Sequence, residues 1–137
     1  MPCDSSILAG KAARIRLLLF DVDGVLTDGR VVIHADGSES KQFSIRDGTG
    51  IVWAHRAGIT VGLLSARQSR ATSARAAQLG IRIVRQQPID KLEMYREVLE
   101  QERLADEHVA FMGDDLMDLP VLSRVGLSAA PADAVFK

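Results

Sequence analysis

Two acidic clusters follow apolar runs in this sequence, and their side chains are of the type that binds cations or attacks phosphorus. The stretch LLLFDVDGVLTDG at residues 17–29 places Asp21 and Asp23 directly after four apolar residues, with Asp28 further on. The stretch MGDDLMD contributes three more carboxylates: Asp114, Asp115 and Asp118. Acids at neighbouring strand ends repel each other unless a cation lies between them. Oxygen ligands without nearby His or Cys favour Mg²⁺ over zinc.

Simpler interpretations account for part of this pattern. A D-x-D pair alone is often only a polar turn that closes a strand. One or two acids of the second cluster would serve as N-caps that also favour a helix dipole. Neither interpretation explains five acids at the ends of two apolar runs, so we predict a functional site there.

Two further side chains complete the pattern of a phosphate site. Ser65 ends the apolar run ITVGLLS, and Lys91 follows QPID at the start of a helical stretch. Each residue alone would more often be structural or solvated. Together with a cation, a hydroxyl and an ammonium group would surround the phosphoryl oxygens while a carboxylate attacks phosphorus. The pair Asp21 and Asp23 could then divide two roles, attack and proton transfer, that one carboxylate cannot fill at once.

The elements that must position these residues alternate along the chain. Short apolar runs predict strands buried on both faces, at residues 15–20, 59–65, 81–84, 108–113 and 125–130. Apolar residues at helical spacing predict helices at 50–58, 68–80, 91–105 and 115–126. This alternation is typical of an α/β fold with a Rossmann-like parallel sheet flanked by helices. Ligands of such sheets bind beyond the carboxyl ends of the strands, where the acids fall.

One segment interrupts the alternation. Residues 29–45, GRVVIHADGSESKQFSI, contain two β-rich runs around ADGS, which predicts a β-hairpin flap after the first strand. The insertion is too short for a cap domain, so we expect one domain over residues 1–137. A lone hairpin is marginally stable and exposes strand edges, which predicts pairing with hairpins of other subunits.

Composition and charge narrow the partners. Of the 137 residues, 47% are hydrophobic and 26% are charged, as in ordinary globular domains. The net charge of -1 gives no basic field for a phosphate backbone, so we expect no nucleic-acid partner. Cys3 is the only cysteine, and the opening residues contain no signal-like or membrane-spanning apolar run. We therefore expect a cytoplasmic protein without membrane association.

The order of these motifs resembles the haloacid dehalogenase superfamily of aspartate-nucleophile phosphatases. The shared pattern is DxDGVLTDG, then a Ser after the second strand, a Lys, and GDDxxD. Within it, IRDGTG at 45–50 and SAR at 65–67 resemble motifs of the subfamily that hydrolyses 3-deoxy-D-manno-octulosonate 8-phosphate. The similarity extends over about residues 15–132.

The resemblance implies roles for the acidic residues. Asp21 would be the nucleophile and a metal ligand. Asp23 would be the general acid and base, with its main-chain carbonyl also reaching the metal. Asp114 would complete the protein ligands of Mg²⁺, with Asp115 and Asp118 as outer or helix-anchoring acids.

The resemblance also implies how substrate is held. Ser65 and Lys91 would bind the transferring phosphoryl group. Without a cap, selectivity would come from the walls of the site, where the candidates beside Asp23 and Lys91 are Ser44, Arg46, Asp47, Gly48, Arg67 and Arg75. Guanidinium groups bind carboxylates in bidentate pairs, which predicts a sugar-acid phosphate, an octulosonate or nonulosonate phosphate, as substrate. The resemblance further implies a homotetramer.

Alternatives remain at this point. A phospho-acceptor domain of the receiver type also combines acids, a hydroxyl and a lysine, but its phosphorylated aspartate would follow the third strand. A silent regulatory module of the same fold, or a phosphatase for another small phosphomonoester, would carry the same motifs. Turnover of a phosphomonoester separates the silent module from an enzyme.

Overall fold

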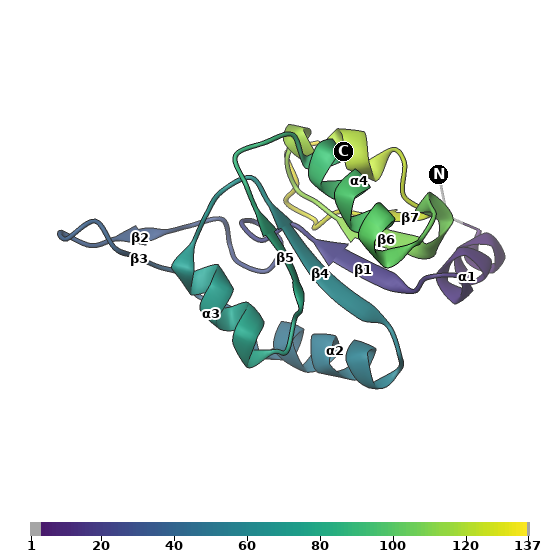
Figure 1. Cartoon of the computed structure of the whole chain (residues 1–137), viewed down its shortest axis with the longest axis horizontal. Coiled ribbons are helices and arrows are strands. Elements are labelled where there is room, and N and C mark those ends of the chain that lie inside the picture. The colour runs from purple at the N-terminus through teal and green to yellow at the C-terminus, as the bar shows by residue number, and fades with distance from the viewer. Residues whose placement is uncertain (1–3, 137) are drawn as a thin grey trace.

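A five-stranded parallel sheet forms the centre of the computed structural model, which describes residues 4–136 (Figure 1). The strand order is β5-β4-β1-β6-β7, and every neighbouring pair is parallel. The strands are β1 Leu17–Phe20, β4 Thr60–Ser65, β5 Ile83–Gln86, β6 Val109–Met112 and β7 Leu127–Ala129. The α/β fold predicted from the sequence is therefore confirmed, and the first strand lies at the centre of the sheet.

Helices flank this sheet on both faces (Figure 1). They are α1 Ser5–Ala13, α2 Ile45–Arg56, α3 Arg70–Gln78, α4 Lys91–Glu102 and α5 Leu119–Leu122, with 3-10 turns at Asp106–His108 and Leu116–Asp118. Helix α1 was not predicted. None of its residues is buried, so its sequence lacks the apolar stripe from which an amphipathic helix is predicted. Over residues 4–136, no helix is long and apolar enough to cross a membrane.

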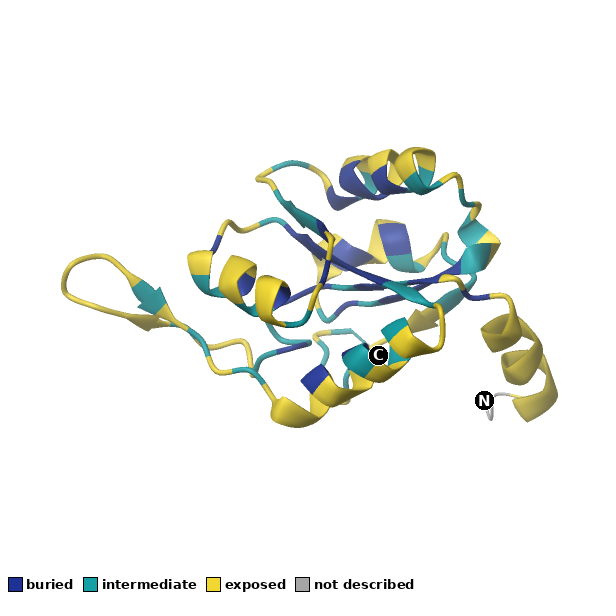
Figure 2. Ribbon diagram, turned by 60° about the horizontal axis from the view of Figure 1, so that its bottom comes forward, coloured by how far each residue is buried: buried dark blue, intermediate teal, exposed yellow. Residues whose placement is uncertain are grey.

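The run LLLF supplies the cores on both faces of the sheet, because successive side chains in a strand point in opposite directions. Leu17 and Leu19 belong to one cluster, with side chains of α4 and α5. Leu18 and Phe20 pack against a second cluster, which includes side chains of α2 and α3. Figure 2 shows the buried residues along the strands and on the helix turns that face them. Strand β1 is thus fixed from both faces, and the chain leaves it at a defined position.

The predicted hairpin projects beyond the sheet (Figure 1). Its strands, β2 Val32–Ile33 and β3 Glu39–Ser40, pair antiparallel, with Val32 opposite Ser40 and Ile33 opposite Glu39. The turn contains Gly37 at φ 86°, in the left-handed region that glycine adopts without strain. Val32 and Ile33 are 57% and 64% exposed, so the hairpin presents apolar side chains to its surroundings.

Helix α2 begins at Ile45, five residues before the predicted start at residue 50. Its N-cap is Ser44, whose hydroxyl accepts a hydrogen bond from the backbone N–H of Asp47. The two glycines of IRDGTG lower helix propensity by about 1 kcal/mol each, but capping and the burial of Ile51 outweigh them. The IRDG motif therefore lies on the first turn of a helix.

Candidate active site

The acids after β1 and β6 meet because these two strands are neighbours. The backbone N–H of Asp21 donates to the carbonyl of Met112 at 3.0 Å, which extends the pairing one residue past β1. Gly24 turns the chain away at φ 87°, and a Cβ there would lie 1.8 Å from Oδ2 of Asp114. Only glycine allows the loop after β1 to approach Asp114 so closely.

A buried lysine joins two of the carboxylates. Lys91 is the first residue of α4, and its Nζ lies 2.8 Å from Oδ1 of Asp21 and 2.5 Å from Oδ1 of Asp118. The other carboxylate oxygen of Asp118 accepts hydrogen bonds from the backbone N–H groups of Asp114 and Asp115. Asp118 thus anchors both Lys91 and the loop after β6, while Asp115 caps the following turn by accepting from the N–H of Leu116.

The charges of this network alter the protonation of its members. Burial raises the pKa of Asp21 to about 7, with Asp118 and Asp114 adding to the rise and Lys91 opposing it. Burial by itself would lower the pKa of Lys91, but Asp21 and Asp118 outweigh that effect and raise the pKa above its usual value. Lys91 is therefore a cation at neutral pH, and one ammonium does not fully offset the burial of Asp21. A further positive charge beside Asp21 would favour its ionised form.

The residues at this position fit a divalent cation. Asp21, Asp114 and Asp118 each place an oxygen within 4.8 Å of the others. Both oxygens of Asp118 are already engaged, whereas Oδ1 of Asp114 is buried without a hydrogen-bond partner in the described part of the chain. A buried, unpaired carboxylate oxygen beside a second carboxylate is suited to Mg²⁺. The carboxylate of Asp23 is outside this group, so its predicted part in metal binding rests on its main-chain carbonyl.

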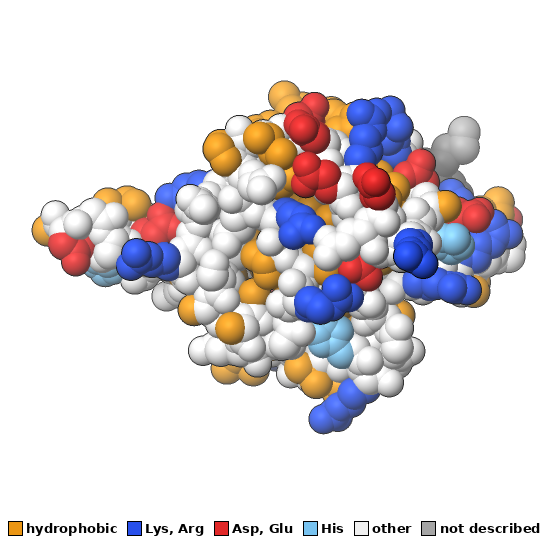
Figure 3. Space-filling view, in the orientation of Figure 1, with side chains coloured by type: hydrophobic (Ala, Val, Ile, Leu, Met, Phe, Trp, Pro, Cys, Tyr) orange, Lys and Arg blue, Asp and Glu red, His pale blue; other side chains and the backbone are white. Residues whose placement is uncertain are grey.

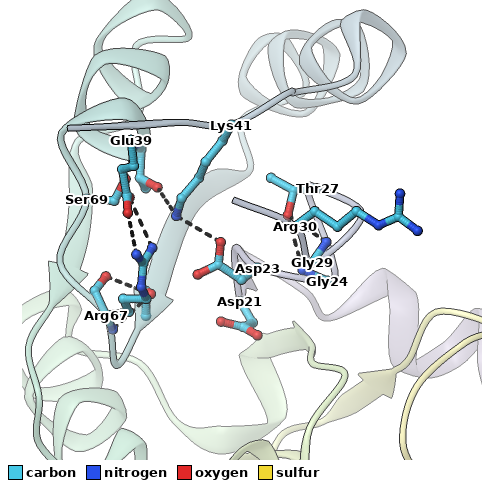
Figure 4. A network of polar contacts seen from close by, with 12 residues as sticks. Asp21, Asp23, Gly24, Thr27, Gly29, Arg30, Glu39, Lys41, Arg67 and Ser69 are labelled. Atoms are coloured by element: carbon cyan, nitrogen blue, oxygen red, sulfur yellow. Dashed lines mark hydrogen bonds and ion pairs between the residues drawn. The ribbon is translucent and has the colours of Figure 1, made fainter. Parts of the chain in front are cut away.

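The Asp23 side chain instead points to a residue that sequence reasoning missed. Lys41, which follows β3 at the base of the hairpin, places its Nζ 2.8 Å from Oδ1 of Asp23 (Figure 4). Its Nζ also donates to Oγ1 of Thr72 in α3 at 3.3 Å. No motif marks Lys41, but alternation along the hairpin places it on the same side as Glu39. The alternation in SESK, residues 38–41, was the sequence signal that could have indicated a role for Lys41.

Ser65 lies at the carboxyl end of β4, where it was predicted, and is buried. Its hydroxyl donates to the carbonyl of Arg67 and accepts from the N–H of Arg67, at 3.1 and 3.2 Å. The guanidinium of Arg67 forms a two-pronged ion pair with Glu39 of the hairpin (Figure 4). Arg67, predicted to bind a substrate carboxylate, thus already has a carboxylate partner within the chain.

The structure brings together Arg75, Ser44 and Gly48 where α3 meets the start of α2. A guanidinium N–H of Arg75 donates to the carbonyl of Ser44 at 3.2 Å, and the group lies over the ring of Phe43. A Cβ on Gly48 would lie 2.5 Å from Nη2 of Arg75, so glycine leaves room for the contact. These contacts hold the N-terminus of α2 in place.

The remaining two candidates from the IRDG motif face a different space. Arg46 and Asp47 line a cavity of about 270 Å³ whose other lining residues are mostly apolar and include Phe20 and Met112. Phe20 immediately precedes Asp21, and Met112 lies two residues before Asp114. The cavity therefore borders the strand ends that carry the acids.

This sheet, with an acid pair after its central strand and a lysine, a serine and a second acidic loop beside it, defines a phosphatase of the haloacid dehalogenase class. No family model matches the chain. The chain is 44% identical to 3-deoxy-D-manno-octulosonate 8-phosphate phosphatase KdsC of Escherichia coli K12 over 133 residues, covering 97% of this chain and 70% of that protein. It belongs to the family of 3-deoxy-D-manno-octulosonate 8-phosphate phosphatases.

Solved structures agree with this assignment. The crystal structure of the phosphatase from Yersinia pestis matches with a TM-score of 0.92 and 42% identity, over 95% of this chain and 70% of that one. The Moraxella catarrhalis phosphatase, solved in complex with magnesium, phosphate and KDO, matches with a TM-score of 0.93 and 30% identity, over 98% and 76% of the two chains.

Proposed function

We propose that this chain is a Mg²⁺-dependent phosphomonoesterase that converts 3-deoxy-D-manno-octulosonate 8-phosphate, or a nonulosonate phosphate of the same class, into the sugar acid and phosphate. The observation that carries the proposal is the buried contact of Asp21 with Lys91, beside the unpaired oxygen of Asp114. The Moraxella relative, with magnesium, phosphate and KDO bound, supports the same cofactor and substrate here.

Asp21, Asp114 and the main-chain carbonyl of Asp23 would hold the cation. When bound, Mg²⁺ supplies positive charge that neutralises the phosphoryl oxygens and favours the ionised form of Asp21. Lys91 supplies a second positive charge beside Asp21. The Ser65 hydroxyl, which donates to the carbonyl of Arg67 in the structure, would exchange that bond for one to the phosphoryl group.

The first half of the reaction transfers the phosphoryl group to the protein. A carboxylate oxygen of Asp21 attacks phosphorus and forms a bond to it, while the bond from phosphorus to the sugar oxygen breaks. The protonated carboxyl group of Asp23 gives its proton to the departing sugar oxygen, so the product leaves as a neutral alcohol. The two residues are suited to these roles because they leave β1 two positions apart.

The second half returns the protein to its starting state. The carboxylate of Asp23 takes a proton from a water molecule, whose oxygen attacks the phosphorus of the aspartyl-phosphate. The bond between Asp21 and phosphorus then breaks, which releases phosphate and leaves Asp23 protonated for the next cycle.

The walls of the site would select the sugar acid. Arg46 and Asp47, which line the cavity beside the acidic loops, are proposed to contact the sugar, and Arg67 would contribute from the loop after β4. Arg75 and Ser44 would act by holding α2, since their contact joins α3 to the start of that helix.

Assembly and location extend the proposal. Figure 3 shows hydrophobic side chains on the projecting hairpin, and Val32 and Ile33 there are exposed. This exposure supports a homotetramer in which hairpins pack together. We also place residues 1–137 in a single domain with its flap at 29–45. The single cysteine, Cys3, which lies outside the described residues, supports a reducing cytoplasmic location.

The test is phosphate release from 3-deoxy-D-manno-octulosonate 8-phosphate by the purified protein with Mg²⁺, beside neutral sugar phosphates of similar size. We expect the sugar-acid phosphate to be hydrolysed with the highest kcat/KM. A protein that hydrolyses none of these compounds would contradict the proposed function.

A further inference from the structure

Lys41 has an environment that a surface lysine of a hairpin would not have. Its side chain is 0% exposed, although the hairpin strand before it lies at the surface. A buried ammonium group is costly unless it is paired and hydrogen-bonded. Its partners are Oδ1 of Asp23 and Oγ1 of Thr72, at 2.8 and 3.3 Å. The burial of Lys41 therefore depends on the acid of the proposed active site.

The strand before Lys41 fixes the direction of this contact. Glu39 and Lys41 are two residues apart, so both side chains leave the strand on the side of the site. Between them, Ser40 points the other way, and its hydroxyl lies 2.7 Å from Nε2 of His34. Glu39 pairs with Arg67 (Figure 4), whose N–H and carbonyl are both bonded to the hydroxyl of Ser65. The base of the hairpin is thus tied both to the loop of Ser65 and to the loop of Asp23.

The contact leaves one oxygen of Asp23 available. Oδ1 of Asp23 is buried and contacts Lys41 as an ion pair without hydrogen-bond geometry, whereas the side chain of Asp23 as a whole keeps 26% of its surface exposed. A carboxylate held by one oxygen has its other oxygen fixed in direction, because the group is planar. Proton transfer requires such a fixed direction toward the reacting oxygen.

We infer that Lys41 is a positioning residue that orients Asp23 for proton transfer to the leaving group. The inference rests on the proposed function, since it assumes that Asp23 is the general acid. The competing explanation is that Lys41 only anchors the hairpin. The two explanations differ in how the effect of losing Lys41 depends on the leaving group.

Leaving groups differ in their need for a proton. A sugar alkoxide is strongly basic and must be protonated as it departs, whereas p-nitrophenolate departs readily without a proton. The value of kcat/KM reports the steps up to the first irreversible one, which includes departure of the leaving group. Misplacement of Asp23 therefore lowers kcat/KM for a sugar phosphate and spares p-nitrophenyl phosphate.

The experiment compares both substrates in the wild-type protein, Lys41→Met, Lys41→Arg and the control Lys11→Met on the exposed helix α1. We expect Lys41→Met to lose about 10- to 100-fold in kcat/KM for the sugar-acid phosphate and less than about 3-fold for the aryl phosphate. Lys41→Arg should recover part of the loss, because it keeps the charge. Lys11→Met should behave as wild type.

A double-mutant cycle adds a second readout. Asp23→Asn should show the same dependence on the leaving group. The variant with both substitutions should lose no more kcat/KM for the sugar-acid phosphate than Asp23→Asn alone, because Lys41 acts through Asp23. Additive losses would overturn the inference, as would equal losses on both substrates or no loss at all.

Two controls keep the outcome decisive. If Lys41→Met does not fold, as judged by thermal unfolding, Lys41→Gln replaces it. The same difference between the two substrates in the loss of kcat/KM is then expected. If the wild-type protein does not hydrolyse the octulosonate phosphate, the proposed substrate is wrong. Glycerol 3-phosphate, whose leaving group is also an alkoxide, then replaces it, and the ratio of its kcat/KM to that of p-nitrophenyl phosphate is compared between wild type and variants. The wild-type result thus tests the function, and the ratio in the variants tests Lys41.

Discussion

The Nζ atom of Lys91 lies 2.8 Å from Oδ1 of Asp21, inside the protein and at the carboxyl end of the central strand. Lys91 is 5% exposed and Asp21 is 6% exposed, so this ion pair is shielded from water. Removing one member of a buried pair leaves an uncompensated charge, which typically costs about 3–5 kcal/mol. Asp118, also buried, contacts the same Nζ atom of Lys91. Substitutions at Asp21 therefore need a thermal-unfolding measurement beside the activity assay, because even asparagine, which keeps the shape, removes a charge that pairs with Lys91.

Asp21→Asn keeps this shape and removes the nucleophile. We expect turnover to fall at least ~10²-fold, because an amide does not form the aspartyl-phosphate. Asp28→Asn is the matched control from the same loop, where Oδ1 of Asp28 accepts a hydrogen bond from the N–H of Arg30. An asparagine oxygen can accept the same bond, so this variant should keep wild-type turnover. Near-normal phosphate release by Asp21→Asn would refute the mechanism.

Metal removal should abolish activity, and Mg²⁺ should restore it. Ca²⁺, which is larger and takes more ligands, should bind without supporting the reaction. Binding is measured separately by thermal unfolding, since a ligand at 100 times its Kd stabilises the folded state by about 2.7 kcal/mol. The Tm of the wild-type protein should rise with Mg²⁺, and that of Asp114→Asn should rise much less. A chelator-resistant activity would contradict this prediction.

Selection of the sugar acid should depend on arginines at the walls of the site. We expect Arg46→Ala and Arg67→Ala to narrow the preference for the sugar-acid phosphate over a neutral sugar phosphate. A lost charged hydrogen bond is worth about 1.5–3 kcal/mol, or roughly 10- to 150-fold in kcat/KM. Arg96→Ala, at an exposed position of α4, serves as the control. An unchanged preference in both variants would mean that these arginines serve the fold.

Arg75→Ala should behave differently from these two. Since Arg75 holds the carbonyl of Ser44 at the start of α2, its loss should lower the free energy of unfolding by about 0.5–1.5 kcal/mol, the usual worth of one hydrogen bond. Denaturant titration measures this change. If stability is unaffected while the preference for the sugar acid disappears, Arg75 contacts the substrate instead.

The hairpin should control assembly. We expect charged residues in place of its exposed apolar pair, in the variant Val32→Lys with Ile33→Lys, to convert a tetramer into smaller species in size-exclusion chromatography. Ile7→Lys, at a similarly exposed position of α1, is the control. Substitution is preferable to deletion of the hairpin, because deletion would also remove Lys41 from Asp23. An unchanged elution volume in the double variant would contradict the prediction.

Much of this protein is determined by its sequence alone. Apolar runs of strand length and the spacing of the acids are local properties, so they predicted the five strands, the hairpin and the clustering of Asp21 with Asp114 at one edge of the sheet. The prediction of a site rested on the general rule that ligands of parallel sheets bind beyond the carboxyl ends of the strands. That rule does not give the strand order, which places β1 beside β6 and was decided by the tertiary structure.

The tertiary structure decided which charged residues find partners. Lys41 meets Asp23, Glu39 meets Arg67, and Arg75 meets the carbonyl of Ser44, and each of these contacts joins segments that are distant in sequence. The start of α2 at Ile45 was likewise decided by its cap and its packing, against the propensity of two glycines. Local patterns record which residues are buried in a strand or helix, because burial follows its period. They do not record where a long, flexible side chain ends, since that depends on which distant segment folding places beside it.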